Sequence, residues 1–480
     1  MVLAAKLVDA LKTIVGAENV LTDAFDLSLY DADAETLDTA SPDLVVLPAS
    51  TEEVAAVVKA VATLAPTLPV TARGAGTGLS GGATCVRGGL SLVLTRMNKV
   101  LHIDAAERAA LVQVGATNVS VSRQAEPHGL YFAPDPSSQI ASTIGGNIAE
   151  NAGGPHTLKY GMTTHHVLAL KGVNARGEVV ALGGFNRGGL DLTGVVIGSE
   201  GTLMVVTEAL LRLTPLAAKV ETLLAYFPTV RQCGQAVSDI VAQGVVPAAM
   251  EMIDNLTLNA VEDYLGLGLR RDAQALLIIE LDGVEAGIAC ARAIVEKCLH
   301  ENGLLESRWA ENARERADIW KARKTSFGAL GRIAPHGYVL DGVIPRSRLA
   351  EAIEGIAKIG ERHGLTIANV YHAGDGNLHP CMLYHREDQA EVARVISAGR
   401  EILHLCVELG GTLSGEHGIG VEKLMEMESA FGPRDLEFMG LIKTSLDPDG
   451  RLNPGKVLPQ LKTCGESGAR PLLRHQQLSC

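Results

Sequence analysis

The segment that most limits how this chain can fold is Arg73-Gly-Ala-Gly-Thr-Gly-Leu-Ser-Gly-Gly82, which holds five glycines in ten residues. Glycine permits positive φ and lets backbone amides approach a phosphate closely. Thr77 and Ser80 add hydroxyl donors. Apolar runs that predict strands, 70–71 and 90–94, flank the segment, so it is a loop inside a domain and not a linker. Such a loop can wrap a pyrophosphate.

The loop also contains Gly76-x-Gly78-x-x-Gly81, the spacing of the Rossmann fingerprint. A Rossmann loop opens a helix, and an acidic residue follows about 20 positions later. Here the loop runs into further glycines and a predicted strand, and Leu101 stands near the acidic position. The Rossmann interpretation is therefore rejected.

Four further segments mix small hydrogen-bonding residues with glycine or proline. One such segment alone would indicate only a turn, but several in one region favour a large, extended cofactor. They are Pro134-Asp-Pro-Ser-Ser138, Thr143-Ile-Gly-Gly-Asn147, Asn151-Ala-Gly-Gly154 and Gly198-Ser-Glu-Gly-Thr202.

The length of 480 residues predicts two or three domains. Up to about residue 216, glycine turns separate many short strands. They include a hairpin over 167–182 and two strands, 195–197 and 203–206. Beyond residue 221, strands 222–227, 248–253 and 275–281 alternate with helices, which predicts a second α+β domain with helices on one face of an antiparallel sheet. The other expected helices are 1–16, 54–64 (after a capping box, Ser50-x-x-Glu53) and 391–409.

Charge and cysteine usage exclude several function classes. The net charge is −13 without a Lys/Arg-rich run, so nucleic acid and anionic membrane surfaces are poor partners. The eight cysteines form no C-x-x-C pair, which argues against an iron–sulfur cluster, a zinc ribbon and a disulfide framework. The start of the chain predicts neither a signal peptide nor a membrane span, so a cytoplasmic protein is expected.

Histidines mark a second constellation, Asn369-Val-Tyr-His-Ala-Gly-Asp-Gly-Asn-Leu-His379. Strands are predicted at 367–371 and 382–384, and Gly374-Asp-Gly-Asn377 is a strong turn signal. A hairpin would bring His372 and His379 to the two sides of one tight loop, where two imidazoles can begin a metal site.

The third ligand candidate comes from Ser414-Gly-Glu-His-Gly-Ile-Gly420. Glu416 can complete a His₂–carboxylate site with open positions, and His417 would lie beside the metal. Each histidine alone is better explained as an ordinary surface or core residue. Two in a hairpin, with Glu-His between glycines, favour a functional site.

The glycine segments, in this order and after Pro48-Ala-Ser-Thr-Glu-Glu-Val54, resemble the FAD domain of the vanillyl-alcohol oxidase and p-cresol methylhydroxylase (PCMH) family. The resemblance implies that Arg73-Gly-x-Gly-Thr77 holds the FAD pyrophosphate. Some relatives attach FAD through His or Cys, but loop 73–82 contains no His, so FAD is expected to be non-covalent. The implied cofactor-binding residues are Arg73, Gly74, Gly76, Thr77, Gly78, Ser80, Gly81, Ser138, Gly145, Asn147, Gly198 and Gly201.

The histidine motifs, with Leu452-Asn-Pro-Gly-Lys456, resemble one branch of that family. This branch includes glycolate oxidase FAD subunits, D-lactate dehydrogenases and D-2-hydroxyglutarate dehydrogenase. Trp320-Lys-Ala-Arg-Lys324 and Asp341-Gly-x-Ile-Pro345 look most like the glycolate oxidase subunits. In the branch, Arg323 corresponds to the arginine that binds the substrate carboxylate.

The implied fold is α+β, with a PCMH-type FAD-binding domain, a ferredoxin-like antiparallel-sheet substrate (cap) domain and a C-terminal helical segment. The expected boundaries are an N-terminal helical segment over 1–40, the FAD domain over 41–217, the substrate and metal domain over 218–457, and a tail over 458–480.

Three departures from the D-2-hydroxyglutarate dehydrogenase pattern narrow the substrate. Phe327, Val339 and Cys381 stand where that enzyme has Thr, Lys and Asn, which contact the far end of its substrate. Their absence favours a short 2-hydroxy acid such as glycolate or D-lactate.

The resulting hypothesis is oxidation of such an acid by FAD. Arg323 would bind the carboxylate, while a Zn, Mn or Fe ion on His372, His379 and Glu416 would polarise the hydroxyl and His417 would take its proton. Electrons would pass to iron–sulfur and second FAD-domain subunits of a glycolate oxidase complex, or to a quinone, a cytochrome or oxygen. The alternatives are a D-2-hydroxyglutarate dehydrogenase, a non-redox FAD transferase of the alkyl-dihydroxyacetone-phosphate synthase type, and a non-catalytic subunit.

Overall fold

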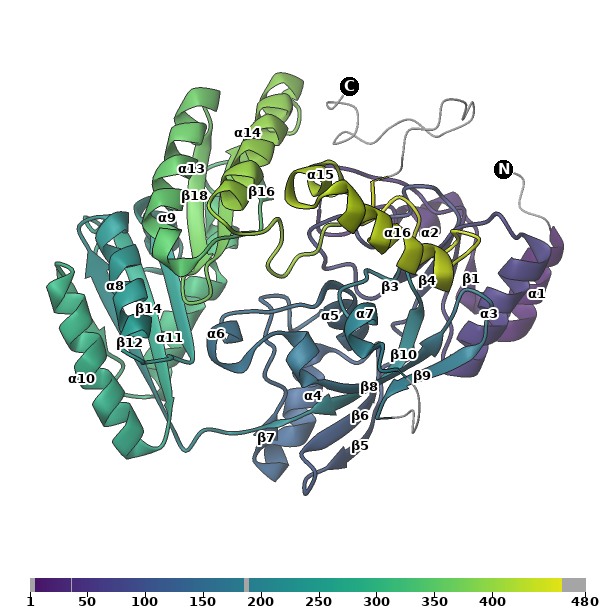
Figure 1. Ribbon diagram of the computed structural model, residues 1–480, viewed down its shortest axis with the longest axis horizontal. Coiled ribbons are helices and arrows are strands. Elements are labelled where there is room, and N and C mark those ends of the chain that lie inside the picture. The colour runs from purple at the N-terminus through teal and green to yellow at the C-terminus, as the bar shows by residue number, and fades with distance from the viewer. Residues whose placement is uncertain (1–4, 36, 185–189, 460–480) are drawn as a thin grey trace. The chain divides into compact units, whose positions relative to one another are not determined.

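The computed structural model describes residues 5–35, 37–184 and 190–459 (Figure 1). Its contacts divide the chain into two compact units. Unit 1 comprises residues 1–153, 162–216 and 416–480, and unit 2 comprises 154–161 and 217–415. The described residues of each unit build separate hydrophobic clusters.

Unit 1 contains two main sheets. The first has the order β1 (Val20–Leu21), β2 (Leu44–Val46), β4 (Leu90–Val93), β3 (Val70–Arg73), and its last three strands are parallel. Helices α1 (Ala5–Val15) and α3 (Thr51–Leu64) bury their apolar stripes against it, including Leu7 and Val57. Ser50 caps α3 as predicted, because its Oγ accepts from Glu53 N. The reciprocal bond of the predicted capping box differs, since Glu53 Oε2 accepts from Ala49 N, one residue before the N-cap.

The second sheet of unit 1 is antiparallel, with the order β5-β6-β10-β8-β9. The predicted hairpin is β8 (Val167–Val173) with β9 (Val179–Gly183). The predicted strand 195–197 is wrong, because α7 (Thr193–Val196) begins there after Asp191 Oδ1 accepts from Thr193 N. A three-residue apolar run carries no periodicity that separates helix from strand. The other strands are β5 (Val100–Asp104), β6 (Ala109–Gln113) and β10 (Val205–Arg212), while β7 (Leu130–Tyr131) and β11 (Thr214–Pro215) form a separate short pair.

Unit 2 is built on one eight-stranded antiparallel sheet, with the order β15-β12-β14-β13-β18-β19-β16 and β17 also paired to β19. The strands are β12 (Lys219–Phe227), β13 (Ala249–Asp254), β14 (Ala275–Gly283), β15 (Glu306–Trp309), β16 (His336–Val339), β17 (Gly342–Val343), β18 (Thr366–His372) and β19 (Asn377–Tyr384).

Helices cover both faces of this sheet, so the expectation of helices on one face is wrong. Helices α9 (Asn255–Leu265), α11 (Ala313–Lys324) and α12 (Ser326–Leu330) share a core with Val370 and Cys381. On the other face, Gly360 of α13 (Leu349–His363) approaches Ile367, and Gly399 of α14 (Gln389–Glu408) approaches Met382. Side chains alternate between the two faces along a strand, so Ile367 and Met382 face away from Val370 and Cys381. The unbroken apolar run 275–279 of β14 is typical of a strand buried on both faces.

Candidate functional site

The glycine loop of unit 1 begins where β3 ends, at Arg73. Gly76 (φ +70°) and Gly81 (φ +74°) adopt backbone conformations that other residues avoid. A Cβ at Gly74 would lie 2.3 Å from Thr143 Oγ1, so this glycine permits close packing against a second predicted segment, 143–147.

That second segment forms the start of helix α5 (Ile144–Glu150), which Thr143 caps by accepting from Gly146 N. Three polar atoms on or near these two segments, Ser80 Oγ, Ser142 Oγ and Asn147 Nδ2, are buried without a hydrogen-bond partner among the described residues. Buried polar atoms are normally paired, so these atoms fit a polar ligand.

The turn 198–202 and two C-terminal segments adjoin the same loop within unit 1. Glu200, with φ 53°, accepts hydrogen bonds from Ile419 N (2.6 Å) and Gly420 N (2.8 Å). Asn453 Nδ2 donates both to Gly82 O (2.9 Å) and to Glu200 O (2.7 Å). The glycine loop and turn 198–202, which the family resemblance assigns to FAD, are therefore joined with these C-terminal segments in one hydrogen-bond network.

The side chain of Arg73 packs against the glycine loop 73–82. Its guanidinium donates to Ala32 O (2.7 Å), and its Nη2 lies 2.3 Å from where a Cβ of Gly76 would stand. The side chain is 8% exposed. In this arrangement Arg73 supports the backbone of the loop, and its direct contact with a pyrophosphate stays a prediction, as does the role of the half-buried Ser138.

A group of buried charges lies among these segments. Burial, together with the nearby carboxyl groups of Glu200 and Asp33, raises the pKa of Glu150 well above its ordinary value. Burial lowers the pKa of Lys456, whose Nζ donates to Gly82 O and Thr84 O.

In unit 2, strand register aligns the predicted histidines. His372 lies opposite Asn377 and Val370 opposite His379, so the two imidazoles share one face of the β18–β19 hairpin. Their ring centroids are 5.0 Å apart and their planes meet at 87°. The predicted hairpin is confirmed, although β19 begins at Asn377, so His379 lies within the strand.

Each of these histidines has one ring nitrogen held by an oxygen acceptor. His379 Nδ1 lies 3.0 Å from Leu340 O, and His372 Nδ1 lies 2.7 Å from Glu251 Oε1. Because a carbonyl or carboxylate oxygen accepts, Nδ1 carries the hydrogen and Nε2 carries the lone pair in the neutral rings. This is the usual arrangement of a histidine that binds a metal through Nε2.

Glu251 lies opposite His372 on the neighbouring strand β13, and it also accepts from Arg323 Nε at 2.6 Å. Burial alone would raise the pKa of Glu251, but His372 and Arg323 outweigh it and hold that pKa below its ordinary value. Arg323, on α11, is 2% exposed, and its Nη2 is buried without a partner in the described parts of the chain. One carboxylate thus joins a predicted metal ligand to the predicted substrate arginine.

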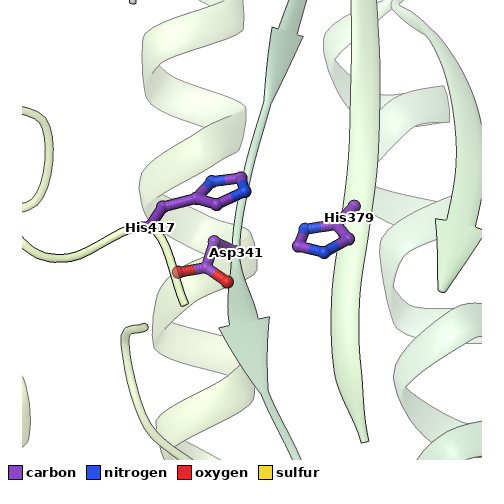
Figure 2. Close-up of side chains that lie close together, drawn as sticks. All are labelled: Asp341, His379 and His417. Carbon is purple, nitrogen blue, oxygen red and sulfur yellow. The ribbon is translucent and has the colours of Figure 1, made fainter. Parts of the chain in front are cut away.

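Asp341 binds the segment at which unit 2 ends, residues 414–415, just before the predicted site residues Glu416 and His417. The register between β19 and strands β16 and β17 places Asp341 opposite His379. Asp341 accepts from Ser414 Oγ (2.6 Å), Gly415 N (3.0 Å) and Asn377 Nδ2 (2.8 Å). Glu416 and His417 follow Gly415 directly as the next residues of the chain, and Figure 2 draws His417 with Asp341 and His379.

Sequence reasoning missed the roles of Glu251 and Asp341. The available signal for Glu251 was a charge between apolar residues in the middle of the strand Ala249-Met-Glu-Met-Ile-Asp254, where a buried carboxylate requires partners. Asp341 stood in a quoted motif, but its role depends on strand pairing. No helix in the described ranges is long and apolar enough to cross a membrane.

Comparisons with known proteins agree on one family. Residues 42–183 match the family model of the FAD binding domain, and residues 216–457 match that of the C-terminal domain of FAD linked oxidases. Glycolate oxidase subunit GlcD of Escherichia coli (strain K12) is 44% identical over 460 residues, which cover 95% of this chain and 91% of that protein.

A D-lactate dehydrogenase of Archaeoglobus fulgidus is 34% identical over 422 residues, covering 87% of this chain and 92% of that protein. Among solved structures, p-cresol methylhydroxylase with substrate bound aligns with a TM-score of 0.78 at 17% identity, covering 94% of this chain and 96% of that one. An alkyldihydroxyacetonephosphate synthase aligns with a TM-score of 0.72 at 21% identity, covering 95% and 86%. At these identities the structural matches show the fold alone.

Proposed function

The chain belongs to the FAD-linked oxidases, and we propose that it oxidises a small 2-hydroxy acid, glycolate or D-lactate, to the 2-oxo acid. The observation that carries this proposal is the buried group in unit 2, where Glu251 ties Arg323 to His372, next to His379. An arginine beside two imidazoles that carry their lone pairs on Nε2 suits a substrate that has a carboxylate and an adjacent hydroxyl.

Unit 1 supplies the FAD site. Loop 73–82, the start of α5 and turn 198–202 offer backbone amides at positive-φ glycines together with buried polar atoms that await a ligand, which fits a long polar cofactor. FAD bound there would supply the acceptor for the hydride of the substrate Cα. No histidine lies in loop 73–82, so the binding is non-covalent.

Arg323 binds the substrate carboxylate in this proposal. Its Nε is engaged by Glu251, while its Nη2 is buried and lacks a partner among the described residues, so an incoming carboxylate can satisfy it. A charge-assisted bond of this kind is stronger in a buried site than in water.

His372, His379 and Glu416 hold the divalent metal. The two imidazoles share one face of the β18–β19 hairpin, Glu416 follows Gly415 of unit 2 in the chain, and His₂–carboxylate ligation admits Zn, Mn and Fe. The ion would act as a Lewis acid on the substrate hydroxyl. His417, next to Glu416 in the chain, takes the hydroxyl proton, and a neutral imidazole is suited to this task near pH 7.

An apolar wall favours a short substrate over D-2-hydroxyglutarate. Cys381 follows His379 on the same face of β19, lies opposite Val339, and is 3% exposed. Phe327 and Val339 pack against the same cluster. A second carboxylate directed at this wall would be desolvated without a partner, which is costly.

The relatives support partner subunits, and a cytoplasmic location is our proposal from the sequence. Because the Escherichia coli relative is named as a subunit, we expect this chain to pass electrons to partner subunits, including an iron–sulfur protein and a second FAD-domain subunit. A quinone, a cytochrome and oxygen are the other acceptors to test. We place the protein in the cytoplasm, with any membrane association made through its partners.

The test is anaerobic mixing of the FAD- and metal-loaded protein with glycolate, D-lactate, L-lactate and D-2-hydroxyglutarate, while flavin absorbance is followed. Fast bleaching by glycolate or D-lactate is the expected result. Bleaching by D-2-hydroxyglutarate alone would contradict the argument from the apolar wall. No bleaching by any of the acids would overturn the proposal and favour the non-redox transferase.

His417→Ala tests the base. The rate of bleaching should fall by about 10²–10⁴-fold, the usual contribution of general base catalysis, while FAD remains bound. His404→Ala, on helix α14, is a control that should bleach at the rate of the unaltered protein. A near-normal rate in His417→Ala would remove His417 from the mechanism.

A further inference from the structure

One buried carboxylate is shared by two residues with different predicted tasks. Glu251 is 1% exposed, and its two oxygens face two donors, His372 Nδ1 at 2.7 Å from Oε1 and Arg323 Nε at 2.6 Å from Oε2. His372 comes from strand β18 and Arg323 from helix α11, so the carboxylate of Glu251 on β13 joins these two elements by hydrogen bonds.

We propose that Glu251 is a positioning residue that holds His372 in its Nδ1–H tautomer and fixes Arg323 beside it. This inference rests on the proposed function, because it assumes that His372 binds the metal and Arg323 the substrate carboxylate. Glu251 itself touches neither. Its task is to present His372 Nε2 and Arg323 Nη2 in one fixed arrangement.

The chemistry of the donors supports this role. A guanidinium can only donate, whereas a neutral imidazole can donate from either nitrogen. A carboxylate, which only accepts when ionised, satisfies both partners together and forces the hydrogen of His372 onto Nδ1. A metal must bind the nitrogen without the hydrogen, so the tautomer decides whether His372 can be a ligand at Nε2.

Glu251→Gln preserves the shape of the side chain but replaces one hydrogen-bond acceptor with a donor. The glutamine has one accepting oxygen and one donating amide group. Since Arg323 cannot accept, the oxygen should face Arg323 Nε and the amide group should face His372 Nδ1. The imidazole then has to accept at Nδ1, and its hydrogen moves to Nε2, where it blocks the metal.

The decisive measurement is ¹⁵N NMR of histidine-labelled, FAD-loaded protein without metal, with the His372 signals assigned from His372→Asn. We expect the Nδ1–H form in the unaltered protein and the Nε2–H form in Glu251→Gln. Zinc affinity, measured by competition with a chelator, should fall by about 10–100-fold in the variant, as is usual when the partner of a metal-binding histidine is changed.

Glu251→Asp tests the second half of the inference and serves if Glu251→Gln fails to fold. It keeps the charge and both acceptors but shortens the side chain by one methylene, so it cannot reach both partners at their present distances. We expect His372 to retain Nδ1–H, while the dissociation constant of glyoxylate, the product of glycolate oxidation, rises by about tenfold. An unchanged constant would overturn the assignment of Arg323 positioning to Glu251.

Glu280→Gln is the matched control. Glu280 is a 7% exposed glutamate of the adjacent strand β14, and it accepts from Thr222 Oγ1 and Trp320 Nε1 without touching His372 or Arg323. It should leave the His372 tautomer and zinc affinity unchanged. If both glutamine variants retain the Nδ1–H form, the inference about Glu251 fails. If the unaltered protein shows that form but binds no zinc, the metal part of the proposed function fails while the role of Glu251 stands.

Discussion

At the scale of single residues, Arg323 combines full burial with incomplete hydrogen bonding. Its Nε is paired with Glu251, and its Nη2 has no partner in the described part of the chain. Evolution rarely leaves a buried guanidinium nitrogen unpaired, since such a group costs about 1–3 kcal/mol. We interpret this atom as the receptor for the substrate carboxylate.

Arg323→Lys should therefore weaken substrate binding strongly. An ammonium keeps the charge but cannot place one nitrogen on Glu251 and another on the substrate. We expect KM for glycolate to rise by about 100-fold, equivalent to about 3 kcal/mol, with a smaller change in kcat. Steady-state kinetics with an artificial electron acceptor measure both constants. Arg316→Lys, on the same helix but bonded to Val220 O, should leave KM within a few-fold; equal effects of the two variants would contradict the prediction.

Asp33 makes the stability of unit 1 depend on pH. Burial raises the pKa of Asp33 from 3.8 to about 6, although Glu35 N and Ala83 N donate to its carboxylate. Because its pKa is higher in the folded than in the unfolded chain, Asp33 binds a proton on folding between these values. Its contribution to stability is thus most favourable below pH 4 and is lost as the pH rises through 6.

Asp33→Asn cannot ionise and avoids that loss. Relative to the unaltered protein, the variant should gain stability as the pH rises from 4.5 to 7.5, by up to about 3 kcal/mol. Denaturant unfolding followed by flavin release at several pH values measures the difference. A difference that stays constant across this range would show that Asp33 does not titrate as described.

At the scale of elements, the β18–β19 hairpin depends on Gly376. Its φ is +85°, and a Cβ there would lie 2.1 Å from Ile344 O. Gly376→Ala should destabilise the protein by about 2 kcal/mol or more, because both the backbone conformation and the close contact resist a side chain. Since the hairpin sets the spacing of His372 and His379, kcat/KM should also fall at least tenfold.

Gly364→Ala separates the effect of the backbone conformation from the effect of the close contact. Gly364 also has positive φ, +61°, but nothing lies within 4 Å of its Cβ position. We expect a loss of only about 1 kcal/mol and unchanged kcat/KM. Equal losses in the two variants would mean that the contact with Ile344 has no role.

The same hairpin shows what sequence can predict. Gly374-Asp-Gly-Asn377 signals a tight turn by itself, so the closeness of His372 and His379 followed from local chemistry. Glu251 did not, because its partner His372 lies 121 residues further along the chain and the strand pairing that joins them is not local. The helices on the second face of the sheet were missed for a related reason, since alternation is weak in strands buried on both sides.

At the scale of the whole molecule, unit 1 is assembled from three separate stretches of chain. The predicted domain boundaries at 41, 217 and 457 assume that each domain is one continuous stretch of chain, and they remain predictions. In the structure, residues 451–453 join the first sheet of unit 1, with Val70 N donating to Arg451 O and Asn453 N to Val70 O. Residues 451–453 therefore extend a sheet that starts at Val20.

Asn453 tests this arrangement. Its buried Nδ2 donates to Gly82 O at the end of the glycine loop and to Glu200 O in turn 198–202, two segments that the proposal assigns to FAD. Asn453→Ala removes both bonds, so that Gly82 O keeps only Lys456 Nζ as a side-chain donor and Glu200 O loses the donor from Asn453. The loss of these hydrogen bonds should cost about 1–3 kcal/mol in total, so FAD affinity should fall by about 10–100-fold, as measured by fluorescence titration of the apoprotein.

In the proposal, zinc affinity depends on the histidines of unit 2 and on Glu416, which follows unit 2 in the chain, so it should change little in Asn453→Ala. A loss of FAD affinity alone would show that the C-terminal return, residues 451–453, acts on the flavin site. Asn174→Ala provides the matched control, because Asn174 holds only the β8–β9 turn by accepting from Arg176 N and Glu178 N. If Asn174→Ala weakens FAD as much as Asn453→Ala, the effect is general loosening of unit 1. If Asn453→Ala binds FAD normally, the glycine loop and turn 198–202 hold their positions without the C-terminal return.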